Sequence, residues 1–163
     1  MTGGAVVERL LYGDVVVGGA LPVLGIDVTA TTVVLGALAS RDWRPMHHDR
    51  DFAIQRNGTR DIFLNTPNQA AWFERYVTDW TGPTGRLGRM TFHMNTPVFP
   101  GDHMAFMATV DGTEIDGAGC GWITLDVVLR VGDVTNTACT TRVALPLDKD
   151  DNPWTRRGDA WRP

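Results

Sequence analysis

The sequence predicts an α+β domain in which a curled antiparallel β-sheet wraps around one long central helix. Three observations favour this fold. A long amphipathic helix is marked at residues 67–80, one short β-branched run precedes it, and several strand-like runs separated by short turns follow it. Helical and strand-like segments that are grouped in this way, instead of alternating, are typical of α+β domains. The length of 163 residues fits a single domain over residues 1–163.

The segment before the helix gives weaker signals. Residues 1–30 are rich in glycine and valine, and the short apolar runs at 5–7 and 15–17 indicate short strands or an irregular lead-in. The β-branched run Thr31–Leu35 predicts a strand. Residues 36–42 then predict a short helix.

The long helix has recognisable ends. Thr66 is a good N-cap, and Pro67 suits the first helical position, where its missing N–H does no harm. Gly82 and Pro83 close the other end. At 1.5 Å per residue the helix is about 20 Å long. Its apolar stripe is typical of a core and consists of Ala70, Phe73, Tyr76, Val77 and Trp80.

Strands dominate the chain after Pro83. The short turns between them predict an antiparallel meander. The expected strands are 87–95, 103–110, 122–130 and 137–145, with a loop at 111–121 and a turn at 132–133. The tail that follows, residues 147–163, carries two tryptophans and three arginines. We expect it to dock on a neighbouring subunit or across the chain's own sheet, with a disordered terminus as the alternative.

Composition excludes several classes of partner. Hydrophobic residues make up 43% and charged residues 21%, as is ordinary for a globular domain, and the net charge is −4. This charge offers no basic field for nucleic acid or an anionic membrane, and no apolar run is long enough to span a bilayer. The start of the chain lacks the pattern of a signal peptide, so we expect a cytoplasmic protein with Cys120 and Cys139 as free, buried thiols.

The run from Asp42 to Asp49 carries the clearest chemistry. It reads Asp-Trp-Arg-Pro-Met-His-His-Asp and sets a carboxylate and an imidazole five residues apart. Pro45 pushes the residue before it out of the helical region, so the segment should turn sharply and let Asp42 and His47 converge. An acid and a base around a common water are what hydration of an activated double bond needs. The alternative is structural: Asp42 would cap a helix or turn, and His47 would be a packed core residue.

The spacing Asp-x-x-Pro-x-His resembles the signature of the MaoC-like (R)-specific enoyl-CoA hydratases. The segment Thr96–Asp102 looks like the Pro-Val-x-Pro-Gly-Asp turn of the same family, whose proline and glycine favour a tight turn. The resemblance covers about residues 28–146, which it marks as the core of the domain, and it implies the hotdog fold. Residues 41–51, 61–65 and 75–83 look like the small MaoC-like subunit of actinobacterial steroid side-chain hydratases.

The resemblance implies a function and a set of site residues. Asp42 and His47 would hold the attacking water, with His48 a rival imidazole that the spacing after Pro45 disfavours. In many relatives a His-Gly pair at the start of the central helix donates a backbone N–H to the thioester oxygen. Here Asn65 and Thr66 stand in that place, so the Thr66 N–H or the Asn65 side chain would be the oxyanion donor, unless Asn65 only caps the helix.

The resemblance also implies the partners. The relatives hydrate the α,β-unsaturated CoA thioester of a shortened cholesterol side chain, so a steroid-derived acyl group is a candidate here. The small subunit pairs with a second, different MaoC-like chain, so we expect an acyl-CoA substrate and a second hotdog subunit, in a homodimer or a heteromer. No cofactor beyond the CoA thioester and no metal site is expected. The alternatives are a hotdog thioesterase and a non-catalytic acyl-CoA-binding subunit.

Overall fold

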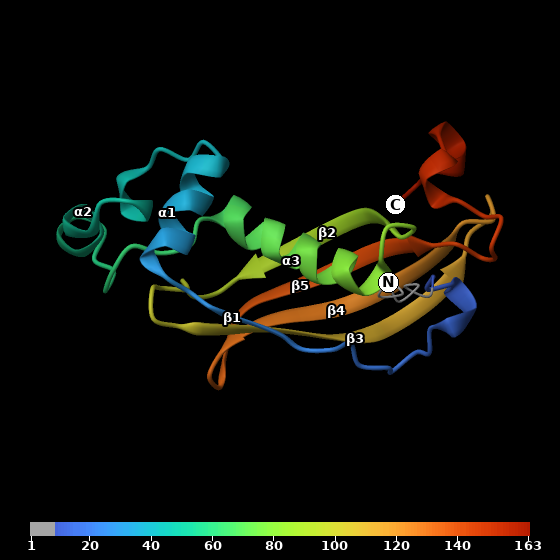
Figure 1. Ribbon diagram of the computed structural model, residues 1–163, viewed down its shortest axis with the longest axis horizontal. Helices are drawn as coiled ribbons and strands as arrows, with labels where there is room; N and C mark the ends of the chain where they lie inside the picture. Colours follow the sequence, from blue (N-terminus) through green and yellow to red (C-terminus); the bar gives the residue numbers. More distant parts are fainter. Residues whose placement is uncertain (1–8) are drawn as a thin grey trace, which may run out of the picture.

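A computed structural model describes residues 9–163, and it contains one five-stranded sheet with a long helix lying along one face (Figure 1). The strand order is β1-β3-β4-β5-β2, and every neighbouring pair is antiparallel. The predicted antiparallel sheet around a central helix is therefore confirmed. The predicted meander holds only for β3, β4 and β5, because β2 pairs with β5 at the edge of the sheet and not with β3. The elements are β1 (Leu24–Asp27), α1 (Ala30–Ala39), α2 (Arg50–Gln55), α3 (Thr66–Thr81), β2 (Arg86–Met94), β3 (His103–Ile115), β4 (Gly121–Val131) and β5 (Val134–Leu145). Four short 3-10 turns are η1 (Tyr12–Asp14), η2 (Pro45–His47), η3 (Pro153–Thr155) and η4 (Gly158–Ala160).

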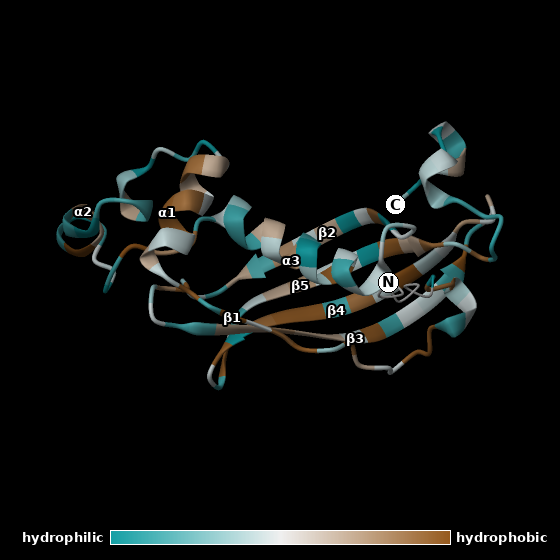
Figure 2. Cartoon of the chain, viewed as in Figure 1, coloured by the Kyte–Doolittle hydropathy of each residue, from teal (hydrophilic) through white to brown (hydrophobic). Residues whose placement is uncertain are grey.

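Helix α3 forms the core with the sheet. Phe73 and Val77 are fully buried, and Tyr76 is nearly so, which confirms the middle of the predicted apolar stripe. The ring of Phe73 lies edge-on to Phe92 of β2 at 5.3 Å and to Phe106 of β3 at 5.0 Å. In Figure 2 long hydrophobic stretches run along β3 and β4. Within the described part of the chain, no helix is both long and apolar enough to cross a membrane.

The strand predicted at Thr31–Leu35 is wrong, because these residues lie within α1. Thr29 caps this helix: its hydroxyl accepts the Thr32 N–H at 3.0 Å, and its own N–H donates to the Thr32 hydroxyl. Burial of Val33 then outweighs the weak helix propensity of β-branched residues. The early strand of the sheet is β1 instead. Residues 15–17 form no strand, and the expected run at 5–7 lies outside the described residues.

Other boundaries differ in smaller ways. Asn65, and not Thr66, is the N-cap of α3, because its side-chain oxygen accepts the Asn68 N–H at 3.2 Å. The expected loop at 111–121 is shorter, because β3 continues to Ile115 past a bulge between Val110 and Gly112. Helix α2 was not predicted; it is a single short turn capped by Asp49.

The C-terminal tail packs on the chain's own sheet, on the face that Trp122 of β4 occupies. The Trp161 ring lies 4.8 Å from that of Trp122, and the Arg86 guanidinium lies 3.5 Å above the Trp161 ring. Arg86 also donates to the carbonyl oxygens of Pro153 and Arg156 at 3.0 Å. The expected docking across the sheet is thus what the fold shows.

Candidate active site

The catalytic candidate Asp42 is positioned by the sharp end of α1. Ser40 is the C-cap, and Arg41 has a φ of 55°, in the left-handed region. The Arg41 N–H donates to Leu38 at 3.1 Å, and the Asp42 N–H donates to Ala37 at 2.9 Å. This pair of bonds is a Schellman motif, which normally places glycine where Arg41 stands. The motif turns the chain back, so that Asp42 faces the start of α3.

His47 is positioned by the turn that Pro45 starts. Arg44 has extended backbone angles, and Pro45 opens η2, as the sequence predicted. The His47 side chain is 3% exposed, and its Nδ1 lies 2.8 Å from the Phe63 carbonyl oxygen. A carbonyl only accepts, so Nδ1 carries a hydrogen and Nε2 is the free acceptor of the neutral ring. The structure thus brings the imidazole and the carboxylate together.

The distance from His47 Nε2 to Asp42 Oδ2 is 3.6 Å. That is too long for a hydrogen bond, but one water at about 2.8 Å could contact both atoms. Arg44 forms a bidentate ion pair with the same carboxylate. Its Nε donates to Oδ1 and a terminal nitrogen donates to Oδ2, each at 2.8 Å. These bonds from Arg44, aided by Asn65, hold the pKa of Asp42 well below its usual range although burial opposes them. Asp42 is therefore a carboxylate.

Asn65 links the start of α3 to this carboxylate. Its Nδ2 donates to the Ser40 hydroxyl at 2.8 Å and to Asp42 Oδ2 at 3.0 Å, while its oxygen caps α3. Both of its side-chain hydrogens are therefore engaged. The Thr66 N–H, at the first position of α3, has no acceptor among residues 9–163. Of the two oxyanion candidates, this geometry leaves the backbone of Thr66 as the available donor.

The turn that resembles the family motif supports the strand-like segment before α3. Gly101 has a φ of 89°, and its N–H donates to Val28 at 2.8 Å. The Leu64 N–H donates to Val98 at 3.0 Å, which fixes the segment that carries the Phe63 carbonyl and Asn65. The turn therefore contributes no side chain to the site, but its backbone holds in place the segment that leads into α3.

The neighbouring polar residues do not join the pair. The exposed His48 ring contacts the Trp43 carbonyl at 3.3 Å, and Asp49 accepts the Phe52 N–H at the start of α2. Within residues 9–163, no three His, Cys, Asp or Glu side chains are grouped as metal ligands would be. The sequence did not reveal that Arg44, Ser40 and the Asn65 amide orient Asp42, because no local pattern reports contacts of that kind. For Asn65 it indicated only an oxyanion donor or a helix cap.

Large apolar side chains are exposed on the chain segment that leads into Asp42. Trp43 is 65% exposed, and Leu35 and Leu38 of α1 are 57% and 43% exposed. These three residues, the apolar flank, precede or adjoin Asp42 in the chain. Exposed apolar side chains so close in sequence to Asp42 indicate contact with a ligand or with another chain.

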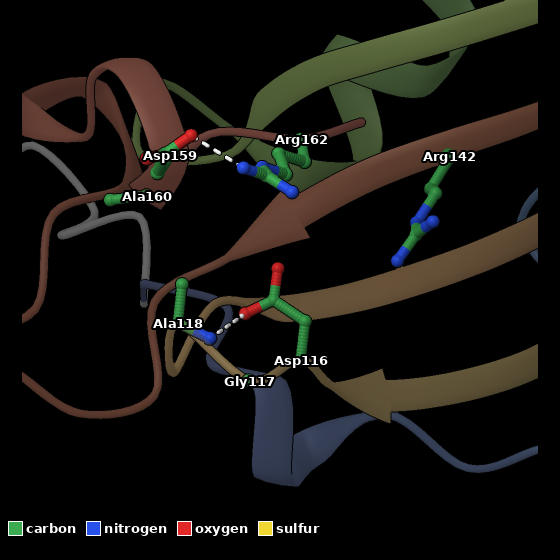
Figure 3. Close-up of a pocket in the computed structure, with 7 residues that line it drawn as sticks. All are labelled: Asp116, Gly117, Ala118, Arg142, Asp159, Ala160 and Arg162. Carbon is green, nitrogen blue, oxygen red and sulfur yellow. Dashed lines mark hydrogen bonds and ion pairs between the residues drawn. The ribbon is translucent and has the colours of Figure 1, made fainter.

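A separate hollow lies elsewhere on the surface. It has a volume of about 670 Å³ and lies between the β3–β4 turn and the tail. Its charged groups already have partners: Asp159 pairs with Arg162, and Asp116 accepts the Ala118 N–H (Figure 3). Figure 1 shows α1 and the tail at opposite ends of the molecule, so this hollow is not part of the Asp42–His47 site.

Comparison with known proteins identifies relatives of the chain. No protein-family model matches the chain. The chain is 36% identical over 115 residues to the 3-oxo-4,17-pregnadiene-20-carboxyl-CoA hydratase beta subunit of Mycobacterium tuberculosis, a match that covers 71% of this chain and 84% of that protein.

Solved structures agree with the fold. A chain in the ChsH1-ChsH2 complex of Mycobacterium tuberculosis superposes with a TM-score of 0.74 at 34% identity, covering 80% of this chain and 98% of that one. The (R)-hydratase of A. caviae involved in PHA biosynthesis superposes with a TM-score of 0.72 at 22% identity, covering 81% and 98% of the two chains. The expected hotdog fold is confirmed by these superpositions.

Proposed function

The chain belongs to the MaoC-like hydratase family, and we propose that it adds water to the trans-2 double bond of an enoyl-CoA thioester. The observation that carries the proposal is the pairing of the Asp42 carboxylate with the bare Nε2 of His47, 3.6 Å apart in a turn set by Pro45. This pair is what positions and deprotonates a water. The structural alternative for these two residues explains neither the free Nε2 nor the buried carboxylate beside it.

The reaction needs a second element, because negative charge collects on the thioester oxygen as water attacks Cβ. The Thr66 N–H at the start of α3 is the donor that we assign to that oxygen, with the helix dipole adding to its effect. The reaction is redox-neutral and requires acid–base groups and an oxyanion donor. We therefore propose that only the CoA thioester of the substrate itself takes part, without a further cofactor or metal.

The apolar flank supports a proposal for the acyl group of the substrate and for the partner subunit. A bulky polycyclic acyl group, such as one derived from a steroid, would cover Trp43, Leu35 and Leu38 better than a short chain would. Strand β2 lies at one edge of the sheet, and its outer side pairs with no other strand in the described part of the chain. A second hotdog subunit could pair with the nine-residue backbone of this strand. We propose a heteromer with another MaoC-like chain, located in the cytoplasm, where Cys120 and Cys139 would stay reduced.

The test is a direct assay of hydration. The full chain, alone and with a second MaoC-like chain from the same source, is incubated with short-chain, long-chain and steroidal enoyl-CoAs, and loss of the conjugated thioester absorbance is followed. Light scattering gives the mass of each assembly. We expect hydration of a steroidal substrate by the mixed assembly. Release of free CoA instead would identify a thioesterase.

Variants separate the catalytic pair from its surroundings. Asp42→Asn and His47→Ala should each lower kcat by about a thousandfold or more, since each removes a contact to the reacting water. His48→Ala is the matched control, because its exposed ring contacts only the Trp43 carbonyl among the described residues, and it should keep near-native turnover. Hydration that survives in the first two variants would identify this chain as a non-catalytic subunit.

A further inference from the structure

Arg44 and Asn65 hold the Asp42 carboxylate from opposite sides. Arg44 comes from the loop after α1, and Asn65 is the N-cap of α3. Together they place three side-chain N–H donors on Asp42, two at 2.8 Å and one at 3.0 Å. The side chain of Asp42 is only 9% exposed, whereas that of Arg44 is 62% exposed. A surface arginine therefore controls a buried carboxylate.

We propose that Arg44 and Asn65 are positioning residues that fix Asp42 as an ionised, hydrogen-bond-saturated carboxylate, so that His47 Nε2 is the atom that carries the proton. This inference rests on the proposed hydration. Protonation of Asp42 would cost the bonds from both donors, so Asp42 is a poor base and a good anchor for water. His47 has the opposite character, since its Nδ1–H is fixed on the Phe63 carbonyl and its Nε2 is free.

The proton route then balances without a co-reactant. The water oxygen forms a bond to Cβ while one water proton moves to His47 Nε2. The π-electron pair of the double bond moves onto the thioester oxygen, which makes an enolate. The imidazolium then returns a proton from Nε2 to Cα, and the thioester carbonyl is restored. Asp42 accepts a hydrogen bond from the same water throughout and keeps its charge.

Two titratable groups surround Asp42, so the assignment of the proton to His47 depends on few charges. Arg44 from the loop and His47 from η2 are the titratable groups that contact Asp42, while α1 and α3 contribute the neutral Ser40 and Asn65. Removing the Arg44 charge should therefore leave the carboxylate unbalanced next to the imidazole. The imidazolium form is then favoured, and the pKa of the carboxyl, which Arg44 depresses most, rises. Protonation of His47 or of Asp42 would then suppress the reaction up to a higher pH than in the native protein.

The test compares Arg44→Gln with Arg56→Gln, an exposed arginine at the end of α2 without a side-chain partner within residues 9–163. In Arg44→Gln we expect the acid limb of the kcat/KM profile to move to higher pH. We also expect kcat to fall about tenfold with little change in KM, because a misplaced catalytic group slows the chemical step more than binding. Arg44→Lys keeps the positive charge but loses the bidentate geometry of the guanidinium. It should therefore keep the acid limb at its native pH but retain only part of kcat.

Asn65→Ser provides a second, independent variant. Serine keeps the N-cap of α3 but cannot donate as the amide does, so thermal stability should hold while the acid limb shifts as in Arg44→Gln. Acid limbs of Arg44→Gln and Asn65→Ser that coincide with that of Arg56→Gln would overturn the proposal.

A measurement without substrate keeps the inference separate from the proposed function. NMR titration of the His47 ring, assigned among the four histidines with the His47→Ala variant, should shift to higher pH in Arg44→Gln but not in Arg56→Gln. If the native assembly hydrates no enoyl-CoA, the proposed function fails, yet the shift still supports the positioning role. An unchanged His47 titration in Arg44→Gln refutes the positioning role whatever the activity.

Discussion

Replacing Trp161 by alanine should detach the tail from the sheet and lower the free energy of unfolding. Trp161 covers Trp122, which is 1% exposed, and its ring also lies under Arg86 at 3.5 Å. The aromatic pair contributes about 0.5–1.5 kcal/mol and the cation–π contact about 0.5–1 kcal/mol. Burial of part of the indole adds about 1 kcal/mol, so the expected loss is about 2–3.5 kcal/mol.

The assay combines thermal unfolding with thiol labelling. For a domain of this size, each kcal/mol shifts Tm by about 2–4 °C, so the variant should melt about 4–14 °C below the native protein. Cys120 lies in the cluster under the tail, with Trp122, Ala144 and Trp161, whereas Cys139 lies in the main core. Burial raises the pKa of both thiols, so neither should react in the native protein.

In the Trp161→Ala variant, Cys120 should become reactive while Cys139 stays protected. The control is Trp154→Ala, because Trp154 is 52% exposed and its indole N–H donates only to the Gly85 carbonyl, at 3.2 Å. Its loss should cost less than about 1.5 kcal/mol, as for a single neutral hydrogen bond. Native-like melting of Trp161→Ala with Cys120 still protected would refute the reasoning.

Three further predictions concern single positions. Arg41→Gly should stabilise the protein in chemical denaturation by about 0.5–1 kcal/mol, because relief of a left-handed φ of 55° exceeds the entropy cost of glycine; a loss of stability would contradict this. Gly36→Ala should cost about 1–3 kcal/mol, because a Cβ there would lie 1.8 Å from Asn68 Nδ2, and a neutral result would mean that α1 and α3 separate easily. In Asp116→Asn the bonds that depress the pKa of this carboxyl, first from the Cys120 N–H and then from the Trp122 indole, are weakened. The native protein should therefore be the more stable one above about pH 4 and should lose that advantage as the pH falls further, which unfolding at several pH values would check.

The sequence predicted what local patterns encode. Asp42 and His47 are separated by a proline-initiated turn, so their convergence depends on a few consecutive residues. The ends of α3 carry cap and breaker residues, and short turns account for the neighbouring strands β3, β4 and β5. They do not account for β2, which pairs with β5 and not with β3. By contrast, Thr31–Leu35 is part of a helix. Its secondary structure depends on the cap at Thr29 and on burial against other elements, and neither can be read from the composition of the run.

The contacts that orient Asp42 could not be predicted in the same way. Asn65 is 23 residues from Asp42 in the chain, and only the fold brings its amide to the carboxylate. Arg44 is two residues away, but an exposed arginine beside an aspartate is more often a solvated pair than a clamp on a buried group. The burial of Asp42, which gives the Arg44 contact its weight, exists only in the folded chain.

This arrangement separates the chemistry from the choice of substrate. The groups that we assign to proton transfer and charge stabilisation, Asp42, His47 and Thr66, are all held by backbone and side-chain contacts within one chain. The apolar flank of Leu35, Leu38 and Trp43 is left exposed, so it is free to contact an acyl group or the second subunit that we propose. A second subunit that covers the flank would therefore set the size of the acyl group accepted. The pH dependence of hydration would remain a property of this chain, because it is set by Asp42, Arg44 and His47.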